Sequence, residues 1–265
     1  MVKYLFDNLE DMNKFKNDNN TAIITDIDGT ISAIAPTPEE AVVTEPMRRK
    51  LIKLKEKFGL LAVISGRSAN NAKKMVGIED ILYVGNHGLE YIFNEEYQVA
   101  DEVKKYLPQI KKSAQKINEE LYNIPCILFE DKEICYSIHF RQCNEPEHVR
   151  EEIINAIKKS PESKNLQISE GRKLVELKPP SSYDKGTIIH RIIEDHNLRK
   201  VIYLGDDITD FDAFKKLKEL EKEGKIQGTS ILVLSSEIPN YVKNSSSFFV
   251  YNVNEVLKFF RWLLG

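Results

Sequence analysis

Few cysteines, little excess charge and no long apolar run limit what this chain can be. Its three cysteines, Cys126, Cys135 and Cys143, lack the paired spacing of a metal site, so we expect reduced, packed thiols. No apolar run approaches the length of a membrane span, and the acidic N-terminal segment does not resemble a signal peptide. A net charge of −3 gives no electrostatic reason to bind nucleic acid or a membrane surface. We therefore expect a soluble, cytoplasmic protein without either partner.

The residues that are present favour a packed α/β protein. Hydrophobic residues make up 42% of the 265-residue chain, and glycine and proline are too sparse for a disordered chain. Strand and helix patterns alternate before residue 100 and again after residue 184. Early strands end in polar residues or glycine, as at the ligand-binding edge of an open α/β sheet. The strand patterns lie within 21–25, 60–67, 81–88, 200–207 and 230–236, and helix patterns cover 46–58, the segment after 184–186, and 253–264.

The middle of the chain follows a different pattern. A helical stripe covers residues 101–121, with a kink expected at Pro108. A hairpin within 126–141, a second helix and a second hairpin over 166–178 follow. This order is typical of an α+β module inserted into an α/β chain.

These patterns predict a fold class and a division into domains. We expect an α/β protein with a Rossmann-like, doubly wound parallel-sheet core formed by residues 1–100 and 181–265. Residues 101–180 would form an inserted α+β cap domain.

Carboxylates gather at the ends of two predicted strands. Asp26 and Asp28 follow the first strand, and Asp206, Asp207 and Asp210 follow a later one. Acidic residues before glycine are common in turns, but so many at one sheet edge would repel each other. At about 4 Å and an effective dielectric near 20, each like-charged pair costs roughly 4 kcal/mol. A hard divalent cation with oxygen ligands relieves that repulsion, so we predict a Mg²⁺ site.

A metal with carboxylates suits phosphate chemistry when hydroxyls and cations lie nearby. Ser65 ends a predicted strand and could donate to a phosphoryl oxygen, and Lys185 opens a predicted helix and could bind phosphate. A single serine or lysine is more often a helix cap or a surface charge. Their order along the chain, between the two acidic groups, makes them specific.

That ordered set resembles the four motifs of the haloacid dehalogenase-like (HAD) phosphotransferases. The motifs are Asp26-x-Asp28-Gly-Thr30, then Ser65, then Lys185, then Gly205-Asp206-Asp207-x-x-Asp210. The resemblance implies the fold above, with a cap of the larger, C2 type. It also implies that Asp26 attacks phosphorus, that Asp28 serves as acid and then base, and that Thr30 holds Asp28 in place. Mg²⁺ would be held by Asp26, Asp206 and the Asp28 carbonyl, while Asp207 or Asp210 orients these ligands and Lys185.

The predicted cap carries a strand with two different faces. Ile134, Tyr136, Ile138 and Phe140 alternate with Cys135, Ser137, His139 and Arg141, so the first set should pack inward. The second face could be solvated or could bind a ligand.

Further stretches resemble the trehalose-6-phosphate phosphatase family. They are 63-VISGRS-68, 85-GNHGLE-90, 137-SIHFR-141, 171-GRKLVELKP-179 and, most specifically, 204-LGDDITDFDAF-214. The resemblance implies that Glu130, Lys132 and Glu176 read the sugar, although the first two could form an exposed hairpin tip. Arg67, a further candidate for substrate binding, could equally be a structural bridge. The other candidates for substrate binding are Gly66, Arg67, Asn86, His87, His139 and Arg141.

The resemblance implies Mg²⁺-dependent hydrolysis of trehalose 6-phosphate to trehalose and phosphate. The alternatives are a phosphatase for sucrose 6-phosphate or mannosyl-3-phosphoglycerate, and a phosphomannomutase-like transferase. A regulatory pseudo-phosphatase is the non-enzymatic alternative, but it should have lost catalytic residues that are present here, such as Asp26 and Lys185. We expect a monomer that binds a small sugar phosphate, with a trehalose-6-phosphate synthase as a possible partner.

Overall fold

The computed structural model describes residues 2–171, 173–235 and 238–265. The chain divides into two compact units: unit 1 comprises Met1–Gln98 and Tyr183–Gly265, and unit 2 comprises Val99–Ser182. Arg172, within the predicted second hairpin, and Ser236, the last residue of the predicted strand 230–236, lie outside the described residues.

Unit 1 is built on one large sheet, which confirms the predicted parallel core. Its order is β1-β13-β12-β11-β2-β3-β4-β5-β6 among the described residues. In this spatial order, each neighbouring pair from β1 through β13, β12, β11, β2 and β3 to β4 is parallel. Strand β5 runs antiparallel to β4. The bounds are β1 Lys3–Tyr4, β2 Thr21–Thr25, β3 Leu60–Ile64, β4 Leu82–Gly85, β5 Glu90–Phe93, β6 Glu96–Val99, β11 Lys200–Gly205, β12 Gln227–Val233 and β13 Phe248–Val250.

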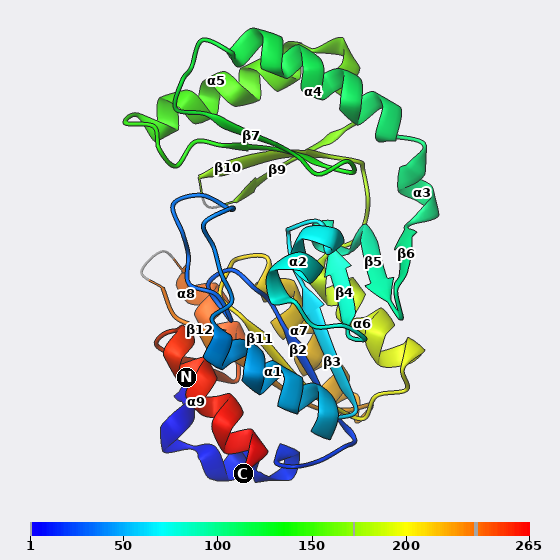
Figure 1. Cartoon of the computed structure of the whole chain (residues 1–265), viewed down its shortest axis with the longest axis vertical. Helices are drawn as coiled ribbons and strands as arrows, with labels where there is room; N and C mark the ends of the chain where they lie inside the picture. Colours follow the sequence, from blue (N-terminus) through cyan, green and yellow to red (C-terminus); the bar gives the residue numbers. More distant parts are fainter. Residues whose placement is uncertain (1, 172, 236–237) are drawn as a thin grey trace. The chain divides into compact units, whose positions relative to one another are not determined.

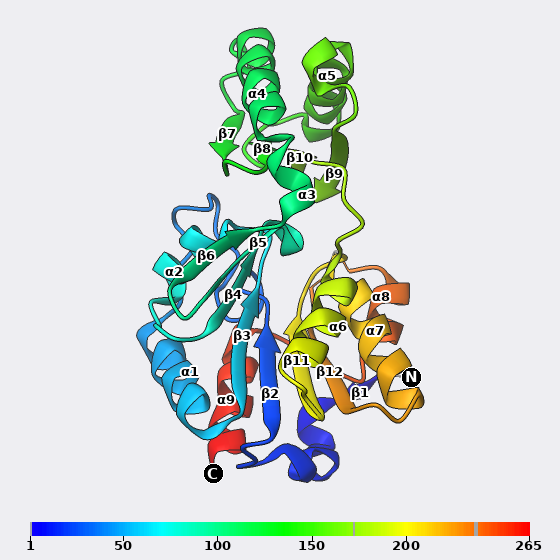
Figure 2. The same cartoon turned by 90° about the vertical axis from the view of Figure 1, so that its right-hand side faces the viewer.

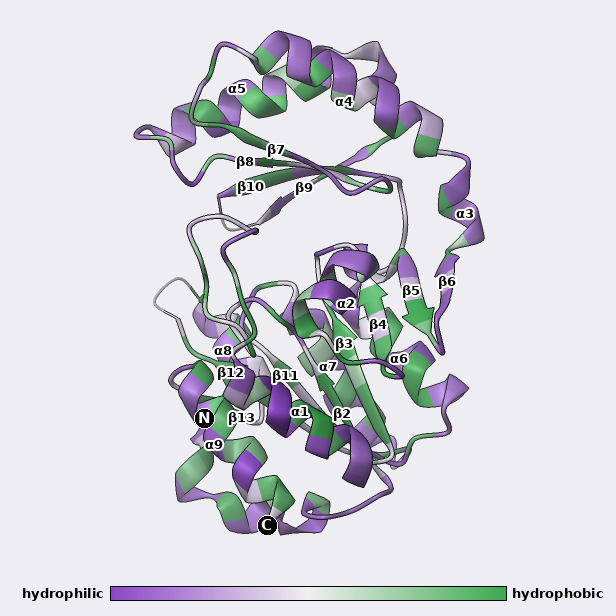
Figure 3. Cartoon of the chain, in the orientation of Figure 1, coloured by the Kyte–Doolittle hydropathy of each residue, from purple (hydrophilic) through white to green (hydrophobic). Residues whose placement is uncertain are grey.

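Helices cover both faces of this sheet, so its strands can be apolar on both sides, as the hydrophobic colouring of β3 and β4 shows (Figure 3). Successive side chains point to opposite faces: Ile23 and Ile24 belong to different core clusters, and both are fully buried. Burying each contributes about 1.5–3 kcal/mol. Figure 2 shows α1 Glu45–Lys57, α2 Ala69–Val76 and α9 Val253–Leu264 on one face, and α6 Lys185–Asp195, α7 Asp210–Lys222 and α8 Asn240–Ser245 on the other. Short 3-10 turns occupy Leu5–Asp7, Leu9–Phe15 and Asn86–Gly88.

Unit 2 is an antiparallel sheet with helices on one of its faces (Figure 1). The order is β7-β8-β10-β9, with α4 and α5 packed on one side through a shared apolar cluster. The strands are β7 Leu128–Asp131, β8 Tyr136–His139, β9 Gln167–Gly171 and β10 Leu174–Lys178. The helices are α3 Asp101–Lys104, α4 Leu107–Leu121, α5 Pro146–Lys159 and the 3-10 turn Pro161–Ser163.

One local prediction for unit 2 needs correction, and another is confirmed. The helix predicted over 101–121 is broken rather than kinked, because Pro108 lies in the first turn of α4, where its missing N–H costs no bond. In β8, Tyr136 and Ile138 face the helices as expected. On the other face, which the pattern left open, Cys135 and Ser137 are buried, and His139 and Arg141 reach solvent.

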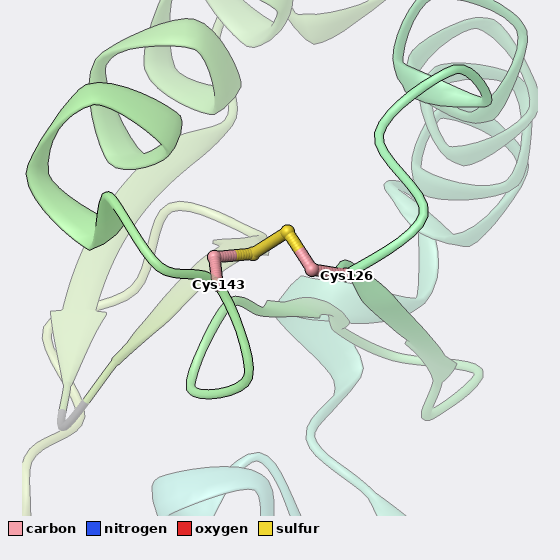
Figure 4. The surroundings of a disulfide bond; sticks show 2 residues. All are labelled: Cys126 and Cys143. Atoms are coloured by element: carbon pink, nitrogen blue, oxygen red, sulfur yellow. A yellow bond between two sulfur atoms is a disulfide. The ribbon is translucent and has the colours of Figure 1, made fainter.

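The expectation of reduced thiols is wrong for two of the cysteines. Cys126 and Cys143 form a disulfide with their Cα atoms 5.1 Å apart (Figure 4). The sequence pattern could not show this, since the pairing depends on how the hairpin folds back. Cys135 stays a buried thiol. Every helix within the described ranges is too short or too polar to span a membrane.

Candidate active site

Three parallel strands of unit 1 end together and place their following residues at one edge. Thr25, the last residue of β2, pairs with Leu204 of β11 and with Val63 of β3. The Asp26 N–H continues the ladder to the Leu204 carbonyl at 2.9 Å. Asp26, Asp206 and Ser65 therefore lie at the carboxyl edge of the sheet, as the strand patterns predicted.

Lys185 lies between the carboxylates of Asp26 and Asp210. Its Nζ is 2.6 Å from Asp26 Oδ2 and 2.6 Å from Asp210 Oδ1. Lys185 is the first residue of α6, which begins there because Asp184 and Thr187 form a reciprocal capping box. The side chain is 2% exposed, so a charged lysine is tolerable only with such partners.

Burial and the neighbouring charges perturb both members of this pair. Burial and the Asp210 carboxylate raise the pKa of Asp26 to about 7, against the opposing effects of Lys185 and the Ile27 N–H. For Lys185, burial disfavours the charge, but Asp210 and Asp26 outweigh it and raise its pKa well above the ordinary value. Strongly perturbed groups at a sheet edge are typical of a reacting centre.

Asp210 is fixed by hydrogen bonds on both oxygens. Oδ2 accepts the backbone N–H groups of Asp206 at 2.9 Å and Asp207 at 2.8 Å. Oδ1 accepts from Lys185 and from the Tyr203 hydroxyl. Asp210 thus orients both Lys185 and the loop that carries Asp206, which fits the positioning role expected for it. Sequence reasoning missed Tyr203, whose only signal was a hydroxyl in an otherwise buried strand.

The carboxylates at this edge could hold a divalent cation. Asp26, Asp206 and Asp210 each offer an oxygen, and these atoms lie within 4.8 Å of one another. Each Asp210 oxygen accepts two hydrogen bonds, whereas each Asp26 oxygen accepts one, from the Ile27 N–H or from Lys185, so Asp26 and Asp206 are the better ligands. Both are nearly buried, at 6% and 3% exposure, and oxygen donors of this kind suit a hard cation. The residues present therefore fit a metal ion.

Asp28 is held by a partner other than the one expected. Arg67 donates to both of its oxygens, from Nε at 2.7 Å and from Nη2 at 2.8 Å. Thr30, expected to hold Asp28, instead donates to Asp206 Oδ1 at 3.3 Å. Arg67 also donates to Asn71 Oδ1 and to the Pro38 carbonyl, so it links several segments of unit 1.

The other candidates of unit 1 lie in the turns after β3 and β4. Ser65 is buried, and its Oγ accepts the Arg67 N–H at 3.2 Å. The ring of His87 packs so closely on Gly66 that a Cβ there would lie 2.8 Å from it. Asn86 is buried and donates to Glu90 Oε1 at 2.8 Å, while Glu90 also accepts the Ala69 N–H. Sequence reasoning missed Glu90, which ties this turn to the start of α2.

Unit 2 gathers the predicted sugar-reading residues on one face of its sheet. Glu130, Ser137 and Glu176 are register partners across β7, β8 and β10. Glu176 Oε1 accepts from Lys132 Nζ and from Ser137 Oγ, each at 2.9 Å. Lys132 is only 8% exposed, so it is not part of an exposed hairpin tip. Burial opposes its charge, but Glu176 and Glu130 raise its pKa.

His139 and Arg141 lie at the rim of this cluster. His139 Nε2 is 2.9 Å from Glu130 Oε2, and His139 is half-buried. Arg141 is exposed. The structure thus brings Glu130, Lys132, His139 and Glu176 together, with Ser137 as a buried partner that the candidate set omitted.

The fold agrees with that of haloacid dehalogenase-like hydrolases. One such hydrolase from Bacteroides thetaiotaomicron superposes with a TM-score of 0.57 at 14% identity, covering 91% of this chain and 98% of that chain. The C-terminal domain of the trehalose-6-phosphate phosphatase of C. albicans superposes with a TM-score of 0.79 at 18% identity, over 99% and 98% of the two chains.

A family model described as trehalose-phosphatase matches residues 24–254. The probable trehalose-phosphate phosphatase 4 of Oryza sativa subsp. japonica is 30% identical over 88% of this chain. The trehalose-phosphate phosphatase of Mycobacterium avium is 32% identical over 80% of it. The chain spans 63% and 54% of the lengths of these two relatives. The chain belongs to the trehalose-phosphatase family.

Proposed function

We propose that this chain hydrolyses trehalose 6-phosphate to trehalose and phosphate with the help of Mg²⁺. The observation that carries the proposal is the buried cluster at the end of β2, where Lys185 lies 2.6 Å from Asp26 and an Asp206 oxygen completes an acidic group. Such a cluster provides a nucleophile, a cation for phosphate and ligands for a metal. Family membership points to the substrate.

In the first step, an Asp26 carboxylate oxygen attacks phosphorus and the bond from phosphorus to the sugar oxygen breaks. Asp28 gives its proton to that leaving oxygen, so neutral trehalose is released. Lys185 and Ser65 hold the phosphoryl oxygens during the transfer. The product on the enzyme is an aspartyl-phosphate at Asp26.

In the second step, water replaces the aspartate. Asp28, now a carboxylate, takes a proton from the water as its oxygen bonds to phosphorus. The bond between phosphorus and Asp26 breaks, which releases phosphate and restores the nucleophile. To give its proton to the leaving oxygen or to take one from water, the Asp28 carboxyl group must rotate away from its two hydrogen bonds with Arg67.

Mg²⁺ would be held by Asp26, Asp206 and the Asp28 carbonyl, and it would stabilise the negative charge of the transferring phosphoryl group. Asp210 would keep Lys185 and the Asp206 loop in place, with Asp207 beside it. Thr30 would act on Asp206 rather than on Asp28, because its hydroxyl donates to Asp206.

Unit 2 would act as the specificity cap. Carboxylate, ammonium and imidazole groups are suitable partners for sugar hydroxyls. We assign this role to Glu130, Lys132, His139, Arg141 and Glu176, and contacts to the phosphate end of the substrate to Gly66, Arg67, Asn86 and His87.

Another phosphate ester, or a regulatory role, is the competing function. The C-terminal domain of a Candida albicans trehalose synthase regulatory protein superposes with a TM-score of 0.68 at 16% identity. We favour catalysis because Asp26, Lys185 and Asp206 are present and lie together. A cytoplasmic location, a monomeric state and a synthase partner belong to the same proposal, and light scattering with and without a synthase would test the last two.

Phosphate release from a panel of esters tests the proposal. The panel holds trehalose 6-phosphate, sucrose 6-phosphate, mannosyl-3-phosphoglycerate, mannose phosphates and an aryl phosphate, each with Mg²⁺ and with excess chelator. We expect Mg²⁺-dependent turnover that strongly favours trehalose 6-phosphate. A different preferred ester would keep the chemistry and change the substrate. Mannose 1- and 6-phosphate that interconvert without releasing phosphate would point to a mutase, and no reaction would point to a regulatory role.

A further inference from the structure

The Cys126–Cys143 disulfide encloses most of the cluster assigned above to sugar binding. The bond shown in Figure 4 joins two cysteines that lie 17 residues apart in the sequence. Four residues of the proposed sugar site lie in the loop that they close: Glu130, Lys132, His139 and Arg141. Glu176 lies on β10 outside the loop but accepts a hydrogen bond from Lys132 within it. The disulfide therefore closes the loop that contains the proposed sugar-binding hairpin.

Strand β7, at one end of this loop, has little burial of its own. It is the edge strand of its sheet, and none of its four residues is buried. Three of the four residues of β8 are buried, which fixes that strand in the core of unit 2. Cys126 precedes β7 by two residues and Cys143 follows β8, so the bond ties the open end of the hairpin, opposite its tip. It restrains the strand that carries Glu130.

The two cysteines differ in how exposed they are, which suits thiol exchange. Cys126 is partly exposed, whereas Cys143 is buried. A thiolate of an external dithiol can attack Cys126 Sγ, and Cys143 leaves as a thiolate and takes a proton. The second thiol of the dithiol then displaces Cys126. Two electrons reach the protein, both cysteines become thiols, and the dithiol becomes a disulfide.

We infer that this disulfide is a thiol-exchange site through which redox state sets the affinity for the sugar phosphate. The inference rests on the proposed function of the Glu130 and Lys132 hairpin. Reduction releases the open end of the hairpin, so Glu130 loses its fixed place beside His139 and Lys132. We expect the KM for trehalose 6-phosphate to rise about tenfold. An aryl phosphate has no sugar to read, and Asp26 and Lys185 lie in unit 1, so its turnover should not change.

The test uses the full chain, oxidised with glutathione disulfide or kept in dithiothreitol. Thiol titration in denaturant should find one thiol in the oxidised protein and all three cysteines reduced in the other. KM and kcat are measured for trehalose 6-phosphate and for an aryl phosphate in both states. The double variant Cys126→Ser/Cys143→Ser should have the KM of the reduced protein whether or not reductant is present. Cys135→Ala should still show a KM that depends on reductant. Hydrogen exchange at 126–132 should become faster on reduction, but exchange around Asp26 should not.

The outcomes separate this inference from the proposed function. An unchanged KM, an equal change for both esters, or three thiols after oxidation would overturn the inference. If neither ester is hydrolysed, the proposed function fails, and calorimetric binding of trehalose 6-phosphate then decides: weaker binding after reduction supports the inference, and equal binding overturns it. If the double variant does not fold, reduced wild-type protein with an unchanged circular dichroism spectrum provides the same comparison.

Discussion

Each compact unit buries a lysine beside two carboxylates, yet the two clusters are built differently. Lys185 in unit 1 is 2.6 Å from each of its partners. Lys132 in unit 2 is 2.9 Å from Glu176 and 3.9 Å from Glu130. The first lysine is 2% exposed and the second 8%.

The difference lies in what fixes the carboxylates. Asp210 accepts two backbone N–H groups from the loop after β11, and Asp26 accepts the Ile27 N–H at 2.6 Å. The carboxylates around Lys132 contact side chains of neighbouring strands, Ser137 and His139 among them. A cluster fixed by the backbone is preorganised for one reaction, whereas one fixed by side chains, with Glu130 on the edge strand β7, can adjust to a ligand.

The largest expected effect concerns the nucleophile. Asp26→Asn should lower turnover of every ester by about 10⁴-fold or more, since the amide cannot attack phosphorus. Phosphate release is the measurement, and circular dichroism checks the fold. Asp195→Asn, at an exposed position of α6, is the matched control and should retain activity. Substantial turnover by Asp26→Asn would place the reacting group elsewhere.

The second prediction compares the two lysines directly. Lys185→Met leaves Asp26 and Asp210 buried without their cation, so it should cost about 3–5 kcal/mol of folding free energy. Lys132→Met should cost less, about 1–3 kcal/mol, because Ser137 still donates to Glu176. Urea unfolding followed by the fluorescence of Trp262, the single tryptophan, reports on unit 1, and circular dichroism reports on both units. Equal losses would contradict the distinction drawn between the clusters.

The unit 1 cluster was more predictable from sequence than the unit 2 cluster, for a physical reason. Buried parallel strands read as apolar runs, and their carboxyl ends share one edge, so the sequence alone places Asp26, Ser65 and Asp206 together. The strand and helix order likewise predicted the doubly wound core. The direction of individual side chains was not predictable, and Arg67 rather than Thr30 holds Asp28.

In unit 2, long-range pairing decides the outcome. The burial of Lys132 depends on its contact with Glu176, 44 residues away, which no local pattern encodes. The disulfide depends in the same way on how the hairpin closes. Reduced thiols were one reason to expect a cytoplasmic protein, and the disulfide removes that reason.

The third prediction tests whether the Lys132 cluster reads only the sugar. Glu176→Gln should lower kcat/KM for trehalose 6-phosphate by about 10- to 100-fold, because it removes a charged hydrogen-bonding group. The same variant should change kcat/KM for an aryl phosphate by no more than about twofold, since that ester has no sugar hydroxyls to contact. Steady-state kinetics on both substrates is the measurement. A matched loss on both would mean that unit 2 supports the reaction itself.

The smallest effect concerns protons at Asp26. Its raised pKa of about 7 means that the folded, metal-free protein binds a proton there more tightly than the unfolded chain does. This contribution to stability is therefore present at low pH and is lost as pH rises from the unfolded value of 3.8 to about 7. A metal must displace that proton, so Mg²⁺ affinity should rise about tenfold per pH unit below 7 and level off above it. Calorimetric titration between about pH 6 and pH 8 measures this slope. Glu176→Gln should keep this pH dependence and Asp26→Asn should abolish it, because the displaced proton belongs to the unit 1 cluster alone. If the pH dependence survives in Asp26→Asn, the proton is bound by another group.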